Sequence, residues 1–180
     1  NHTYMQEFEL LSLSHFLGFC ICLLAIIFIP KAIQAKPGLE NFLKYFLVFL
    51  LAENQIRSTY VETLIKGGNL LENLPLHLCD FSAIVIAVFL LTGFRPLFIF
   101  AYFWGIAGAG MSILTPDSEF AFPHYEYFAT MYGHSLILLA VVFSITNLGQ
   151  RPYLRDIPKL IFYSSILLAV SYTHLRAHET

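Results

Sequence analysis

The sequence predicts an all-α protein, a polytopic bundle of about six transmembrane helices. Of its 180 residues, 57% are hydrophobic and only 12% are charged, and the mean hydropathy is +0.67. These values lie outside the range of ordinary soluble domains. The apolar runs are also long enough to cross the hydrocarbon core of a bilayer, which takes ~20 residues per helix. Charged residues gather at the ends of these runs, as expected for membrane spans.

The first three spans are predicted from apolar runs at residues 10–29, 42–56 and 74–92. The second run has a polar outer end, where Glu53 and Asn54 fall. The third opens after Asn73, a common N-cap residue, with Pro75 in the first turn, where proline is tolerated. We therefore expect polar groups at one end of both the second and the third helix.

The remaining spans are predicted at residues 96–114, 127–148 and 157–171. In the fourth span, Ala101, Gly105 and Ala109 recur every fourth residue, which is typical of close helix packing. The hydrophobic run of the sixth span stops abruptly at Ser171, and residues 171–180 resemble a translated cloning adapter. We expect residues 1–170 to form a single transmembrane helical domain with a truncated C-terminus, and residues 171–180 to be a non-native tail.

The distribution of Lys and Arg among the short loops predicts the orientation of the chain. The first, third and fifth connections carry seven of the ten basic residues, which are Lys31, Lys36, Lys44, Arg95, Arg151, Arg155 and Lys159. The second connection, residues 57–73, is mixed, and its side follows by alternation. The connection between the fourth and fifth spans has no Lys or Arg and contains Asp117. The odd connections are therefore expected in the cytoplasm and the N-terminus outside.

With this topology, polar residues from several spans fall at a similar depth in the outer leaflet, whereas the cytoplasmic halves of the spans are almost purely apolar. A pore lined along its whole length is therefore disfavoured, and a pocket open to the outer leaflet, with membrane lipids as partners, is favoured. The candidate site residues are Glu53, Asn54, His77, Cys79, Asp80, Asp117, His124 and His134. Most of them are expected to bind the polar part of a lipid substrate.

Cys79 and His134 are the candidate catalytic residues. His77 is a poor base for Cys79, because on an ideal helix the two side chains point about 200° apart. His134 arrives from another span at similar depth, and a Cys–His pair is the minimal nucleophile and general base. The alternative is that Cys79 simply packs as a small hydrophobe. Glu53 can likewise be explained by an ion pair with Arg57, one helical turn further on.

The sequence also bears on other function classes. The net charge of −2 and the lack of a long basic run exclude nucleic-acid binding. A non-enzymatic transporter or lipid-binding protein is the main alternative. A zinc hydrolase using His77, Asp80, His124 and His134 is a further one, but the sequence lacks a typical zinc-ligand spacing. Neither a metal nor another cofactor is expected.

Four segments carry a resemblance to a known family: LPLHLCDFSAI, FAYFWGIAGAGMSILTPD, FPHYEYFATMYGHSLILLA and GQRPY. In order and spacing they resemble the YwaF-like bacterial integral membrane proteins, which implies a multi-pass protein of the bacterial plasma membrane. That family is similar to the TMEM164-type proteins, which are linked to transfer of fatty acyl chains between phospholipids and lysophospholipids.

The TMEM164-type proteins use a membrane Cys and a His, and by the resemblance these correspond to Cys79 and His134. The resemblance implies attack of the Cys79 thiolate on a phospholipid ester, an acyl-thioester, and transfer of the acyl group to a lysolipid hydroxyl or to water. His134 would act first as a base and then as an acid.

Overall fold

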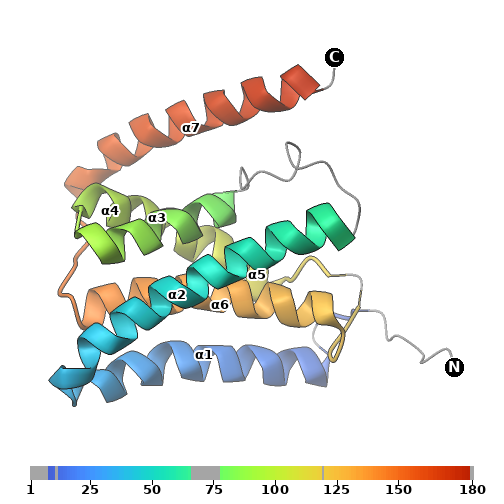
Figure 1. The fold of residues 1–180 in the computed structure, drawn as a ribbon, viewed down its shortest axis with the longest axis horizontal. Coiled ribbons are helices and arrows are strands. Elements are labelled where there is room, and N and C mark those ends of the chain that lie inside the picture. The colour runs from blue at the N-terminus through green and yellow to red at the C-terminus, as the bar shows by residue number, and fades with distance from the viewer. Residues whose placement is uncertain (1–7, 11, 66–77, 119, 179–180) are drawn as a thin grey trace, which may run out of the picture.

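The protein is a bundle of helices, as the sequence predicts (Figure 1). The computed structural model describes all residues except 1–7, 11, 66–77, 119 and 179–180. The described α-helices are α1 (Leu13–Gln34), α2 (Glu40–Tyr60), α3 (Leu78–Thr92), α4 (Arg95–Trp104), α5 (Gly110–Leu114), α6 (Tyr125–Thr146) and α7 (Ile157–His178). Short helical turns are η1 (Pro37–Leu39), η2 (Val61–Ile65), η3 (Gly105–Ala109) and η4 (Leu154–Asp156).

The six predicted spans correspond to α1, α2, α3, the continuous α4–η3–α5 segment, α6 and α7. By length and composition, three described helical segments can cross a membrane, namely Leu13–Gln34, Arg95–Leu114 and Tyr125–Thr146. Cys79–Thr92 is apolar but shorter. The protein is therefore an all-α, multi-pass membrane protein.

Several boundaries differ from those predicted. The Ser12 side chain accepts a hydrogen bond from the His15 amide, so α1 starts later than expected, and α1 then continues through Pro30 to Gln34. α7 continues past Ser171 to His178, because the change in hydropathy at that point does not interrupt the helical backbone. The predicted cap at Asn73 lies outside the described residues.

α6 lies at the centre of the bundle, where α1, α2, α3 and α5 pack against it (Figure 1). The small-residue stripe of the fourth span makes part of this packing possible. Ala101, Gly105 and Ala109 are all buried, and a Cβ atom added to Gly105 would lie 3.1 Å from Ile137 Cγ2 on α6. The predicted role of this stripe in helix packing is thus confirmed.

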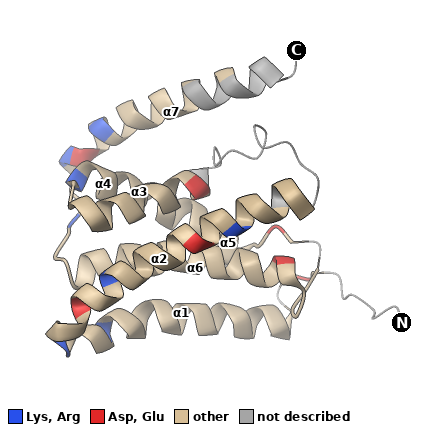
Figure 2. Cartoon of the chain, in the orientation of Figure 1, with Lys and Arg blue, Asp and Glu red and all other residues tan. Residues whose placement is uncertain are grey.

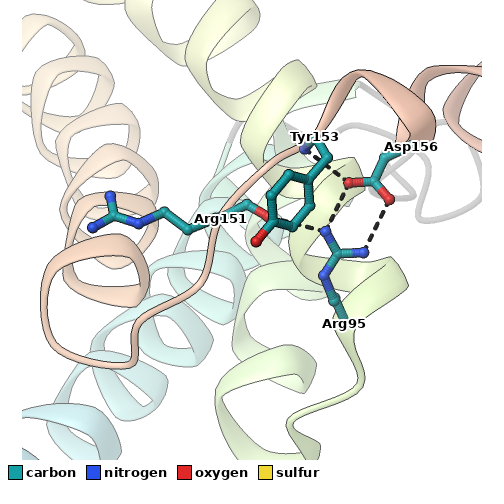
Figure 3. Close-up of polar contacts among 4 residues, drawn as sticks. All are labelled: Arg95, Arg151, Tyr153 and Asp156. Carbon is teal, nitrogen blue, oxygen red and sulfur yellow. Dashed lines mark hydrogen bonds and ion pairs between the residues drawn. The ribbon is translucent and has the colours of Figure 1, made fainter.

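α7 is joined to the bundle by a polar cluster at its start (Figure 3). The Arg95 guanidinium donates to both carboxylate oxygens of Asp156, at 2.9 and 2.7 Å, and to the Arg151 carbonyl oxygen. The hydrogen bonds from Arg95 and from the Tyr153 amide lower the pKa of Asp156 from 3.8 to about 2. Farther along α7, Trp104 Nε1 donates to Ser164 Oγ at 2.7 Å.

Charged residues are distributed unevenly along the bundle (Figure 2). Most basic residues gather at the end where α1 leads into α2 and where α4 begins, whereas acidic residues occur at both ends, near the starts of α2 and α7 and near the starts of α3 and α6. This asymmetry follows the loop charges in the sequence. It gives the bundle a basic end and a second end that carries the polar cavity described below.

Candidate functional site

A cavity of about 450 Å³ opens between α2, α3, α6 and the segment that follows α5. Its wall combines apolar groups with one cationic side chain and three carboxylates. The lining residues with functional side chains are Asn54, Arg57, Cys79, Asp80, Asp117, Glu126 and His134. A polar chamber at one end of an apolar bundle is a typical ligand site.

The structure brings five of the predicted site residues to this cavity, which are Asn54, Cys79, Asp80, Asp117 and His134. They come from α2, from the first turn of α3, from the segment after α5 and from the third turn of α6. Elements far apart in the sequence thus converge on one space. His77 lies outside the described residues.

Cys79 is half-buried and its thiol faces the fourth span. A Cβ atom added to Gly108 would lie 3.0 Å from Cys79 Sγ, so only a glycine lets the thiol fit here without a shift. The Ser112 side chain lies close to the thiol. Gly108 lies in the π-helical turn η3 and Ser112 in α5. The position of the thiol is therefore set by the fourth span as much as by α3.

His134 is held in one tautomer by its own helix. Its Nδ1 atom is 2.7 Å from the Thr130 carbonyl oxygen. Because a carbonyl oxygen only accepts, Nδ1 carries the proton and donates. In the neutral imidazole, Nε2 is then the acceptor nitrogen. His134 thus presents the form of the ring that a general base needs.

Arg57 is one of the cavity residues that the sequence did not assign to a site. Its Nε donates to Glu53 at 3.0 Å, its Nη1 to the Tyr125 hydroxyl at 2.5 Å and its Nη2 to Asn54 Oδ1 at 2.6 Å. The guanidinium also stands 5.7 Å from the centre of the Tyr132 ring. The sequence offered one signal, the spacing of Glu53 and Arg57, and the ion pair predicted from it is present.

Two candidate residues lie beside the cavity rather than in its wall. Glu53 is held by Arg57 next to Asn54. His124 caps α6, where its Nδ1 accepts a hydrogen bond from the Glu126 amide, and its ring packs 4.6 Å from that of Phe120. Within the part of the chain that the structure describes, no three His, Cys, Asp or Glu side chains are grouped so as to hold a metal ion.

His15 is a buried polar residue that does not belong to the cavity. It is buried between α1, α5 and α6, where Nε2 donates to the Leu114 carbonyl oxygen at 3.1 Å. Nδ1 is then the acceptor for the Tyr127 hydroxyl, also at 3.1 Å. Both ring nitrogens are used in joining helices, and His15 is not among the residues that line the cavity.

The fold and the cavity define a multi-pass helical membrane protein with a polar chamber at one end of the bundle. The sequence profile of the TMEM164 family matches residues 4–175, almost the whole length of the chain. The chain therefore belongs to the TMEM164 family. Comparisons with curated proteins and with solved structures give no match.

Proposed function

We propose that the protein is a Cys/His-dependent phospholipid acyltransferase or acyl hydrolase, with Cys79 as nucleophile and His134 as acid and base. One observation carries this proposal. Cys79 on α3 and His134 on α6 line the same polar cavity, and His134 is in the tautomer whose Nε2 can take a proton. A nucleophile and a base from separate helices are the parts that covalent acyl transfer needs.

In the first half-reaction, His134 Nε2 takes the thiol proton, and the sulfur of Cys79 attacks the carbonyl carbon of a phospholipid ester. The carbon–sulfur bond forms while the carbonyl π electrons move to oxygen. When this oxyanion collapses, the ester C–O bond breaks and the leaving lysolipid oxygen takes the proton from His134. The acyl chain is left on Cys79 as a thioester.

In the second half-reaction, a lysophospholipid hydroxyl or a water molecule gives its proton to His134 and attacks the thioester carbon. The carbon–sulfur bond then breaks, and Cys79 leaves as a thiolate that recovers the proton. Transfer to a lysophospholipid makes the protein a transferase, whereas transfer to water makes it a hydrolase. The same two residues serve both outcomes.

Membrane lipids are the substrates that suit this location. The outside of the bundle exposes large apolar side chains such as Phe49, Phe128 and Leu168, which fit a lipid environment. A phospholipid can therefore enter with its tails in the bilayer and its ester near the polar cavity. Asn54, Asp80 and Asp117 line that cavity, and Glu53, His77 and His124 are proposed to help bind the polar head group.

The membrane and the orientation that we propose follow from the resemblance to the YwaF-like family and from the loop charges. We place the chain in a bacterial plasma membrane with its N-terminus outside. The basic end of the bundle then faces the cytoplasm and the cavity opens toward the outer leaflet. The uneven charge distribution seen in Figure 2 supports this orientation.

A second candidate is a non-enzymatic lipid-binding protein or transporter. The observation that favours it is the acidic lining of the cavity, to which Asp80, Asp117 and Glu126 contribute carboxylates. Such a lining attracts a cationic head group whether or not chemistry follows.

An acyl-transfer assay separates the two candidates. The purified chain in lipid vesicles would receive a phospholipid with a deuterated acyl chain and an unlabelled lysophospholipid, and the lipids would be analysed by mass spectrometry. We expect transfer or release with the wild type and with the control Cys20→Ser, which changes a cysteine on α1 outside the cavity wall. Cys79→Ser should abolish it. Activity retained in Cys79→Ser would refute the proposed mechanism, and lipid binding without turnover in the wild type would favour the second candidate.

A further inference from the structure

The side-chain amide of Asn54 is fixed in one orientation inside the cavity. Arg57 Nη2 is 2.6 Å from Asn54 Oδ1. Because a guanidinium only donates, the amide oxygen must face Arg57, and the amide nitrogen Nδ2 must face the other way. The two Nδ2 hydrogens are therefore presented by a group that Arg57 holds in place.

Gly133 makes room for that amide beside the proposed base. A Cβ atom at residue 133 would lie 2.9 Å from Asn54 Nδ2 and 3.3 Å from Asn54 Oδ1. The distance to the nitrogen is shorter than the contacts that real Cβ atoms make. Asn54 thus lies against the backbone of α6, one residue before His134. Asn54, Gly133, His134 and Cys79 all line the same cavity.

We infer that Asn54 donates a hydrogen bond from Nδ2 to the oxyanion that forms when Cys79 attacks an ester, and that Arg57 and Gly133 position it. This inference rests on the proposed function. A tetrahedral intermediate needs a donor already aimed at the developing negative charge. Asn54 supplies a neutral donor that is oriented before substrate binds, so no reorganisation is needed during the reaction. The bonds formed and broken are those of the two half-reactions described above.

The test measures the rate at which a phospholipid with a clickable acyl chain labels the protein, as a function of lipid concentration. Asn54→Asp keeps the side-chain volume and the partner of Arg57 but removes both N–H donors, and Asn54→Leu removes them without adding charge. Gly133→Ala pushes the amide out of place. Gln55→Leu is the matched control, because it removes a side-chain amide from the same helix at a residue outside the cavity wall.

We expect the maximal labelling rate to fall by about 10²–10³-fold in both Asn54 variants, the usual effect of losing one oxyanion donor. The half-saturating lipid concentration should stay near that of the wild type. Gly133→Ala should lower the maximal labelling rate in the same way, whereas Gln55→Leu should leave it unchanged. Thermal unfolding shows whether each variant is folded. If Asn54→Leu is not folded, the comparison of Asn54→Asp with the wild type still tests the inference.

Three results would overturn the inference. Wild-type labelling rates in a folded Asn54 variant would show that the amide does not stabilise the oxyanion. A raised half-saturating concentration with an unchanged maximal rate would make Asn54 a head-group ligand only. In either case the labelling of Cys79 itself, and with it the proposed function, would stand. No labelling of the wild type would contradict both proposals together.

A double-mutant cycle tests the positioning role of Arg57. If Arg57 acts through Asn54, Arg57→Gln slows labelling in the wild-type background and has no further effect in the Asn54→Leu background. Equal slowing in the two backgrounds would mean that Arg57 acts independently of Asn54, and the positioning role would be wrong.

Discussion

Cys79 and His134 line one cavity although they belong to different helices, α3 and α6. The thiol is placed by glycine and serine residues of the fourth span, and the imidazole is placed by the backbone of its own helix. Two independent sets of contacts therefore prepare the two groups of the proposed mechanism.

Replacing His134 with Gln should slow acyl transfer by about 10²–10⁴-fold, the usual contribution of a general acid and base. The loss should be in the rate rather than in lipid binding, and added imidazole should restore part of it. The measurement is lysophospholipid release in vesicles. Ser135→Ala is the control, because it removes a neighbouring buried hydroxyl that has no hydrogen-bond partner in the described structure. Unchanged rates in His134→Gln would exclude the proposed base.

Gly108→Ala should displace the Cys79 thiol, because the new Cβ atom would lie 3.0 Å from Sγ. The thiol must shift by a few tenths of an ångström. Because a misplacement of about 1 Å costs about 10²-fold in rate, we expect labelling to slow by roughly 10-fold. Gly110→Ala is a matched control on the same span, because a Cβ atom there meets nothing within 4 Å. Equal rates in the two variants would show that Gly108 does not position the thiol.

Tyr127→Phe should destabilise the bundle without changing the chemistry of the cavity. The change removes the hydroxyl that donates to His15 Nδ1, and an interhelical hydrogen bond of this kind contributes about 1 kcal/mol. Denaturant unfolding in detergent would measure the loss. Tyr45→Phe, at a residue that is 57% exposed, is the control. If both variants unfold at the same denaturant concentration as the wild type, the His15 contact does not stabilise the fold.

The Arg95–Asp156 pair should make stability depend on pH in the acid range. The pKa of Asp156 is lowered from 3.8 to about 2 in the folded protein, mainly by the hydrogen bonds from Arg95. The folded state therefore favours the carboxylate, and its stabilisation is present above pH 3.8 and is lost as the pH falls through about 2. The wild type should be more stable than Asp156→Asn at pH 7, with the difference shrinking toward pH 2.

Thermal unfolding in detergent across this pH range checks the prediction. Arg95→Gln should lower stability in the same direction, and the double variant should lose little more, because both residues serve one contact. A difference between wild type and Asp156→Asn that stays constant down to pH 2 would contradict the assignment.

The helices were largely predictable from the sequence, because a bilayer requires long apolar runs and places charges at their ends. The contact between Ala101, Gly105 and Ala109 and the neighbouring helix was also predictable, since only small residues permit close packing. The convergence of Cys79, Asp80 and His134 on one cavity agrees with the depth at which each was expected.

What the sequence could not supply was the rotation of each helix about its axis and the paths of individual side chains. His15 contacts Tyr127 and Leu114 and is not among the residues that line the cavity. The π-helical turn that brings Gly108 against Cys79 has no signal in the apolar pattern. The three hydrogen bonds of Arg57 likewise depend on which helices meet at that point.

The most direct test of the central claim is to locate an acyl group on Cys79. Vesicles containing the wild type would be incubated with a phospholipid carrying a clickable acyl chain, and the protein would be digested and analysed by mass spectrometry with and without hydroxylamine. The proposal predicts a hydroxylamine-sensitive acyl group on the peptide containing Cys79, which a chase with lysophospholipid removes. A folded, lipid-binding protein that carries no acyl group at Cys79, or an acyl group only at Cys20 or Cys22, would contradict it.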